Sequence, residues 1–123
     1  MTILEAMDRV DLHLPNGFSR TEKLRWLSRL DGLIYQELHR MYEGSTKPFG
    51  GYDETTDLQT ALLVEEPFAQ ELYLRYLESR IDDANGDTNR FIRSMELFRA
   101  AYKTYARWYN RSHTYKIRYR RFF

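Results

Sequence analysis

The side chains with the clearest potential chemistry lie at the C-terminal end of the chain, where basic and aromatic residues are interspersed. From Leu97 to Phe123 the sequence holds eight Lys or Arg and no Asp or Glu. These cations could neutralise the phosphates of a nucleic acid while the rings stack on its bases, or the rings could insert into a pocket of a partner protein. The cations considered are Arg107, Arg111, Lys116, Arg118, Arg120 and Arg121, and the rings are Tyr115, Tyr119, Phe122 and Phe123.

The last part of this region has the pattern of an extended strand. From Tyr115 to Arg120 apolar and basic residues alternate, which is the period of a strand. A single strand of this length is not stable by itself. Three interpretations remain open: a disordered terminal tail, a strand added to the edge of a partner, and a segment that follows a nucleic-acid backbone. Alternate side chains on one face favour strand addition over direct nucleic-acid binding.

Other residue types that could carry chemistry are scattered. His13, His39 and His113 lie far apart in the sequence, without a carboxylate or a second histidine at the spacing of helical metal ligands. We therefore interpret them as surface or capping residues. The chain has no cysteine, which excludes disulfides, thiolate metal sites and a cysteine nucleophile.

The acidic residues and serines also lack a catalytic pattern. The acidic segment 53–57 does not match a calcium-binding loop. Asp82 and Asp83 are expected at the end of a helix, where a solvated pair or a pair with Arg80 is favoured over a catalytic one. No serine has the glycines of a nucleophile elbow, and the glycines at 50–51 lack the lysine of a phosphate loop. The sequence thus predicts no enzyme, no cofactor and no metal site.

Capping signals and apolar periodicity predict four helices, which position these residues. The longest would run from a cap at Asp87 to Ser112, with large apolar side chains at steps of three and four that form one stripe. The Asn85-Gly86 turn before it predicts that the last two helices form an antiparallel hairpin. The other expected helices are 3–11, 20–44 and 66–85, and the stripe comprises Phe91, Met95, Phe98, Tyr102, Tyr105 and Tyr109.

Two features of this plan leave questions open. Ile92, Leu97, Ala101 and Trp108 give the long helix a second apolar face, which either the first two helices or another subunit must cover. The long connection 43–66 has no helical period, and its apolar residues 62–64 could form a short strand or an apolar plug that enters the core. The predicted fold class is all-α: a small helical bundle built on the hairpin, with a long irregular loop and an extended C-terminal tail.

Size and charge bound the class further. A chain of 123 residues normally forms one domain, here expected over residues 1–113 with a basic aromatic tail at 114–123. Because the net charge is +1 and residues 97–123 carry +8, residues 1–96 carry −7. No secretion signal or membrane span is recognisable, so we expect a soluble, cytoplasmic protein.

The order of these segments resembles a family of small proteins encoded in the structural gene modules of tailed bacteriophages and prophages of Gram-positive bacteria. The resemblance covers roughly residues 1 to 113 and does not include the tail. The matching segments are Glu22-Lys23-Leu24-Arg25-Trp26-Leu27-Ser28-Arg29-Leu30-Asp31-Gly32, Gly51-Tyr52-Asp53, Asp57-Leu58, Leu62-Leu63-Val64, Tyr76-Leu77-Glu78-Ser79-Arg80-Ile81-Asp82, Ala84-Asn85-Gly86, Ala101-Tyr102 and Tyr109-Asn110-Arg111.

In layout that family is similar to the helical head-tail connectors, also called adaptor or head-completion proteins. The resemblance implies a homo-oligomeric ring under the portal protein of the virion, assembled in the host bacterial cytoplasm. Such a ring extends the DNA channel, through which DNA passes without sequence-specific binding, and offers a docking surface to tail or stopper proteins. The alternative is a nucleic-acid-binding regulatory or packaging module that uses the basic tail.

A ring needs a heterologous interface, in which one patch of a subunit meets a different patch of the next. The acidic body and the basic end of this chain satisfy that requirement, and aromatic residues are enriched at interfaces. The residues predicted to contact other subunits or the portal are Trp26, Tyr52, Trp108, Arg111, Tyr115, Ile117, Arg118, Tyr119, Arg120, Arg121, Phe122 and Phe123.

Overall fold

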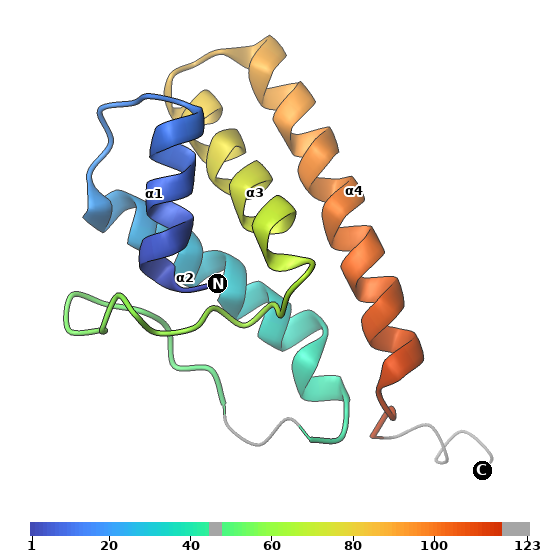
Figure 1. The fold of residues 1–123 in the computed structure, drawn as a ribbon. Helices are drawn as coiled ribbons and strands as arrows, with labels where there is room; N and C mark the ends of the chain where they lie inside the picture. The colour runs from blue at the N-terminus through green and yellow to red at the C-terminus, as the bar shows by residue number, and fades with distance from the viewer. Residues whose placement is uncertain (45–47, 117–123) are drawn as a thin grey trace.

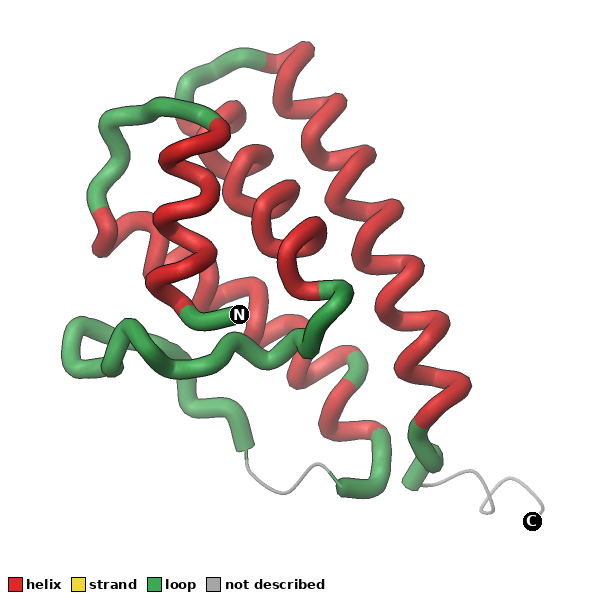
Figure 2. Tube along the Cα trace, in the orientation of Figure 1, coloured by secondary structure: helices red, strands yellow, loops and turns green. Residues whose placement is uncertain are grey.

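The computed structural model describes residues 1–44 and 48–116, and the regular structure of these residues is helical (Figures 1 and 2). The only β-type pairing in this part of the chain is two isolated bridges, Thr2 with Ala61 and Tyr42 with Tyr115. The predicted all-α class is therefore confirmed. The elements are α1 (Ile3–His13), α2 (Arg20–Glu37), the short 3-10 helix η1 (His39–Met41), α3 (Ala69–Ala84) and α4 (Thr88–Ser112).

The helix starts follow the capping signals in the sequence. At α1, the Thr2 hydroxyl accepts from the Glu5 amide at 3.1 Å, and the Glu5 carboxylate accepts from the Thr2 amide at 3.0 Å. This is the reciprocal capping box that the sequence predicts. At α2 only half of the box forms, since the Ser19 hydroxyl accepts from the Glu22 amide while the Glu22 carboxylate pairs with Arg25.

Two predicted helix boundaries are wrong. The second helix was expected to continue to Gly44, but α2 ends at Glu37 and the chain turns through η1. Leu38 and Tyr42, at the two ends of this turn, are buried in the core. The third helix starts at Ala69 and not at 66, because the preceding residues form a turn in which the Phe68 amide donates to the Glu65 carbonyl at 3.1 Å.

Helix α3 is the centre of the fold. It packs against α1 and α2 on one side and along α4 on the other (Figure 1). Gly86, at φ +72°, reverses the chain between α3 and α4, and the Asp87 carboxylate caps α4 by accepting from the Arg90 amide. Among the described helices, neither α1 nor α2 packs on α4, so they do not cover its second apolar face.

The long connection before α3 crosses beneath α1 and re-enters the core as an apolar plug (Figure 1). Leu62 and Val64 are 5% and 1% exposed and join the main hydrophobic cluster. The Ile3 amide donates to the Thr60 carbonyl at 3.0 Å, and the Leu62 amide donates to the Met1 carbonyl at 2.9 Å. Of the two interpretations of residues 62–64, the structure thus supports the plug.

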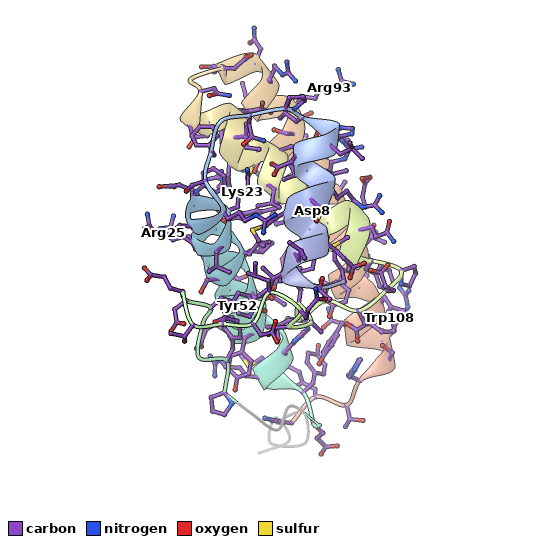
Figure 3. The ribbon with its side chains drawn as sticks, turned by 60° about the vertical axis from the view of Figure 1, so that its left-hand side comes forward. Asp8, Lys23, Arg25, Tyr52, Arg93 and Trp108 are labelled. Carbon is purple, nitrogen blue, oxygen red and sulfur yellow. The ribbon has the colours of Figure 1, made fainter. Side chains whose placement is uncertain are left out.

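A buried lysine fixes the connection between α1 and α2. Lys23 is 2% exposed and its ammonium donates to the Phe18 carbonyl and pairs with the Asp11 carboxylate, both at 2.7 Å. Figure 3 shows Lys23 between α2 and α1, whereas Arg25 points away from the bundle. Because a buried ammonium group must be paired, the contacts of Lys23 hold the two helices together.

Candidate functional site

The carboxylate of Asp31, in the middle of α2, is completely buried and accepts several hydrogen bonds. The Asp31 side chain is 0% exposed. Its Oδ1 accepts from the Tyr73 hydroxyl at 2.6 Å, and its Oδ2 accepts from the Tyr52 hydroxyl at 2.5 Å and from the Leu63 amide at 3.0 Å. The Tyr73 hydroxyl also accepts from the Val64 amide at 3.0 Å. One carboxylate thus joins α2, α3 and two parts of the long loop.

Burial raises the pKa of Asp31, and the three donors oppose that rise by stabilising the charged form. The sequence contained a signal for this site, because Asp31 occupies a position on the apolar stripe of α2 between Leu30 and Ile34. An ionisable residue on a buried stripe requires partners. The partners lie in distant parts of the sequence, which is why the pattern alone did not identify them.

Tyr52, one of the predicted interface residues, belongs to this cluster. Its amide donates to the Ser28 hydroxyl at 2.9 Å, and its ring packs edge-on against Phe49, with centroids 4.9 Å apart. The preceding Gly51 has φ +89°, and a Cβ there would lie 3.2 Å from the Ser28 oxygen. The site therefore requires glycine at 51, and Tyr52 anchors the loop within its own chain while part of its side chain stays accessible.

A second polar cluster lies where the C-terminal half of α4 meets η1 and the loop. The Tyr105 hydroxyl donates to the Glu65 carboxylate at 2.6 Å and accepts from His39 Nε2 at 2.7 Å. Since Tyr105 has a single hydroxyl proton, these two bonds together place a proton on Nε2 of His39. The Tyr105 side chain is 0% exposed and His39 is half-buried, whereas Glu65 is exposed, so this chain of hydrogen bonds leads from the surface into the molecule.

The imidazole of His39 belongs to a stack of three rings. Tyr109 lies between His39, with centroids 4.6 Å apart, and His113, with centroids 3.7 Å apart. Tyr42 meets the Tyr109 ring edge-on at 5.2 Å, and its hydroxyl donates to the Asn110 side chain. The interpretation of the histidines as isolated residues was thus incomplete, because the fold places two of them on opposite faces of one tyrosine.

This stack predicts a pH dependence of stability. Burial lowers the pKa of His39, Glu65 raises it, and His113 lowers it. The native state therefore favours the neutral His39 ring. This preference adds to the free energy of unfolding above the unfolded-state pKa of about 6.5, and the contribution is lost as pH falls through the lower native pKa. We expect the free energy of unfolding to fall between about pH 7 and 5.5, and His39→Phe to weaken this fall.

Urea denaturation of the wild type and of His39→Phe across that pH range measures the effect. Each unit by which the native pKa is lowered corresponds to about 1.4 kcal/mol. Phenylalanine keeps an aromatic ring beside Tyr109 but cannot be protonated. An equal loss of stability in both proteins would show that other groups cause the pH dependence.

The two tryptophans of the predicted interface are half-buried. Trp26 packs against Phe18 with centroids 5.6 Å apart, beside the core stripe of α2 as expected. Trp108 packs against Phe68 at 5.0 Å and lies at the edge of the molecule on α4, on the far side from Arg25 in Figure 3. Neither indole is completely enclosed by its own chain.

The start of the predicted tail pairs with the turn after η1. The Glu43 amide donates to the Thr114 carbonyl at 2.8 Å, and the Lys116 amide donates to the Met41 carbonyl at 2.9 Å. Tyr115 is half-buried and packs against Tyr42, whereas Arg111 is exposed. The other predicted contact residues, Ile117, Arg118, Tyr119, Arg120, Arg121, Phe122 and Phe123, lie outside the described residues.

A polar cleft of about 390 Å³ lies between the end of α1, α3 and the first half of α4. Its groups pair with one another: His13 with Glu78 at 2.8 Å, and the Ser94 hydroxyl with Asp82 at 3.0 Å. Arg90 lies 3.7 Å from Asp82. Because the Ser94 hydroxyl contacts a carboxylate and not an imidazole, the cleft does not present the serine and histidine pair of an acyl-transfer enzyme.

Comparisons with known proteins identify no relative of this chain. No protein family model matches the chain, and no match was found among curated proteins or solved structures. Within residues 1–44 and 48–116, no three His, Asp or Glu side chains are grouped so that they could hold a metal ion. None of the helices in the described ranges combines the length and the apolar character needed to cross a bilayer.

Proposed function

We propose that the chain is a structural subunit that self-associates through a heterologous interface, and that its assembly is the head-tail connector ring of a tailed bacteriophage or prophage. The observation that supports self-association best is the incomplete coverage of α4. Its first half packs only on α3 among the described helices, and Ile92 and Leu97 remain 51% and 38% exposed. On α2, Leu33 is also 49% exposed.

Exposed apolar residues on two different helices fit a head-to-tail contact between copies, in which unlike surfaces meet. The half-buried Trp26 and Trp108 add aromatic surface of the kind enriched at interfaces. The connector assignment itself rests on the resemblance of residues 1 to 113 to the phage structural family. In this proposal the ring binds a portal protein on one side and a tail or stopper protein on the other, around the DNA channel.

The mass of the isolated protein in solution, by light scattering coupled to size exclusion, tests self-association. We expect an oligomer for the wild type, alone or after addition of purified portal protein, and a monomer for Ile92→Ser/Leu97→Ser. The double substitution removes exposed apolar area without changing the charge. The control is Ala100→Ser/Thr104→Ser, two changes at exposed positions of the same helix that remove little apolar area, and it should keep the wild-type mass.

A second measurement tests the connector role. Binding to purified portal that persists at high salt would support it, because an interface with apolar contacts depends less on ionic strength than a purely charged one. A wild-type protein that stays monomeric at high concentration and does not bind portal would contradict the proposal.

A further inference from the structure

The outward face of α4 carries a row of basic side chains that no other part of the described chain uses. The row, here called the α4 basic stripe, consists of Arg93, Arg99, Lys103, Arg107 and Arg111. All five side chains are exposed, and none forms an ion pair with another described residue. From 93 to 111 the stripe spans roughly 27 Å at 1.5 Å per residue.

The stripe lies opposite the side of α4 that packs on α3. The buried side chains of the helix, Ser94, Tyr105 and Tyr109, face the rest of the molecule. The stripe positions from 99 to 111 follow one another at steps of four, which keeps them on one side of the helix about 6 Å apart along its axis. Arg93, labelled in Figure 3, lies in the first half of α4, where its side chain is exposed at the edge of the polar cleft.

Elsewhere in the described chain, many cations already have partners. Arg20 pairs with Asp8, Lys23 with Asp11, Arg25 with Glu22, Arg75 with Glu71 and Glu78, and Arg80 with Asp83. The carboxylates of α1, α2 and α3 are thereby largely neutralised within the same three helices. The stripe keeps its charge, and Glu96 is the single carboxylate on α4.

We propose that the α4 basic stripe binds the phosphate backbone of double-stranded nucleic acid, without reading its sequence. A row of unpaired cations along a straight helix matches a linear polyanion, whose backbone presents phosphates at regular intervals. Arg and Lys at such spacing contribute affinity by releasing counterions, and phosphate contacts of this kind carry no sequence information.

Two observations favour a duplex over other polyanions. The outward face of α4 holds no aromatic residue, either in the stripe or between its positions. Proteins that bind single strands use aromatic rings on which the bases stack. A second copy of this chain offers few unpaired carboxylates in a row. The exposed group Asp53, Glu54 and Asp57 lies within five consecutive positions, which is too short to match a stripe of roughly 27 Å.

This surface shares Arg107 and Arg111 with the cations considered from the sequence, but it lies on the outward face of α4 and does not include the terminal segment. It also does not depend on the ring. The proposal concerns the isolated subunit, so the mass of the assembly and the binding of duplex are separate measurements that can fail separately.

The test is fluorescence anisotropy with a labelled random duplex of about 20 base pairs, at salt concentrations from about 50 to 200 mM. The stripe variant is Arg99→Gln/Lys103→Gln/Arg107→Gln. The matched control is Arg9→Gln/Arg29→Gln/Arg40→Gln, which removes the same charge from exposed positions outside α4. All proteins are full-length and keep residues 117–123, so any binding by the basic terminal segment is the same in each.

Each phosphate contact contributes a slope of about −0.9 to the plot of log affinity against log salt concentration. In the stripe variant we expect the slope to be smaller in magnitude by roughly two to three. We also expect its affinity for the duplex at low salt to be about tenfold lower or weaker still. The control should retain the wild-type slope. A further variant, Arg99→Lys/Arg107→Lys, keeps the charges and should retain most of the affinity. Circular dichroism melting checks that all variants are folded.

Several results would overturn the proposal. These are the absence of duplex binding by the wild type at about 50 mM salt, an equal loss in the control, or tighter binding of a single strand than of the duplex. The stripe variant could also bind duplex like the wild type but differ from it in mass in solution. That result would show that the stripe makes contacts between copies, and it would contradict the proposal.

Discussion

Replacing Asp31 with alanine is expected to lower the free energy of unfolding by about 3–5 kcal/mol. The carboxylate accepts three hydrogen bonds, from Tyr52, Tyr73 and the Leu63 amide. Alanine leaves the fully buried Tyr73 hydroxyl and the part-buried Tyr52 and Leu63 donors without this acceptor, and each buried donor without a partner costs about 1–3 kcal/mol. Urea denaturation at neutral pH measures the loss.

Two further variants separate the lost hydrogen bonds from other effects. Asp31→Asn keeps the volume and one acceptor oxygen, which can still accept from Tyr52 and the Leu63 amide, but its NH2 group replaces the oxygen that accepts from the Tyr73 hydroxyl, so we expect an intermediate loss of about 1–3 kcal/mol. Asp8→Ala is the surface control, because its pair with Arg20 at 3.7 Å is solvent-exposed and contributes about 0–1 kcal/mol. An Asp31→Ala protein as stable as this control would contradict the role assigned to the buried carboxylate.

The predicted helices agree with the structure where the signals are local. The pairing of Thr2 with Glu5 and the turn formed by Asn85 and Gly86 each involve residues within a few positions of one another. Residues this close along the chain determine their own conformation through capping and left-handed glycine. Sequence reasoning placed the start of α1 and the break before α4 correctly for that reason.

The early end of α2 could not be predicted in this way. The apolar steps of α2 continue through Leu38 to Met41, so the pattern favours a longer helix. The chain leaves the helix after Glu37, and the turn through η1 places Tyr42 in the core against Tyr109. Tyr109 belongs to α4 and lies far away in the sequence. Tertiary packing therefore overrides the local period.

The polar clusters were missed for the same physical reason. Asp31 contacts Tyr52 and Leu63, which follow it by 21 and 32 positions, and His39 contacts Tyr105 across 66 positions. Spacing within one helix does not reveal such pairs. The charge asymmetry, by contrast, was visible in the sequence, and the structure adds that the α4 basic stripe forms no ion pair among the described residues, whereas Arg90 of the same helix pairs with Asp82.

Replacing Tyr109 with alanine is the second substitution with a large expected effect, a loss of about 3–5 kcal/mol in the free energy of unfolding. Tyr109 is 6% exposed and its ring separates His39 from His113. Alanine would leave a cavity between the two imidazoles and remove the edge contact with Tyr42. The control is Tyr102→Ala on the same helix, where a half-buried ring and a hydrogen bond to Glu37 at 3.3 Å predict a loss of about 1 kcal/mol.

Hydrogen exchange of individual amides distinguishes a local from a global loss of structure. The ring of Tyr109 supports the turn after η1 and the residues that follow α4, where the Glu43 amide donates to Thr114 and the Lys116 amide donates to Met41. In Tyr109→Ala these two amides should exchange much faster, whereas exchange of the Leu63 amide bonded to Asp31 should accelerate only as far as the global loss of stability requires. Unchanged exchange of the Glu43 and Lys116 amides would show that the ring stack does not hold the end of α4 to η1.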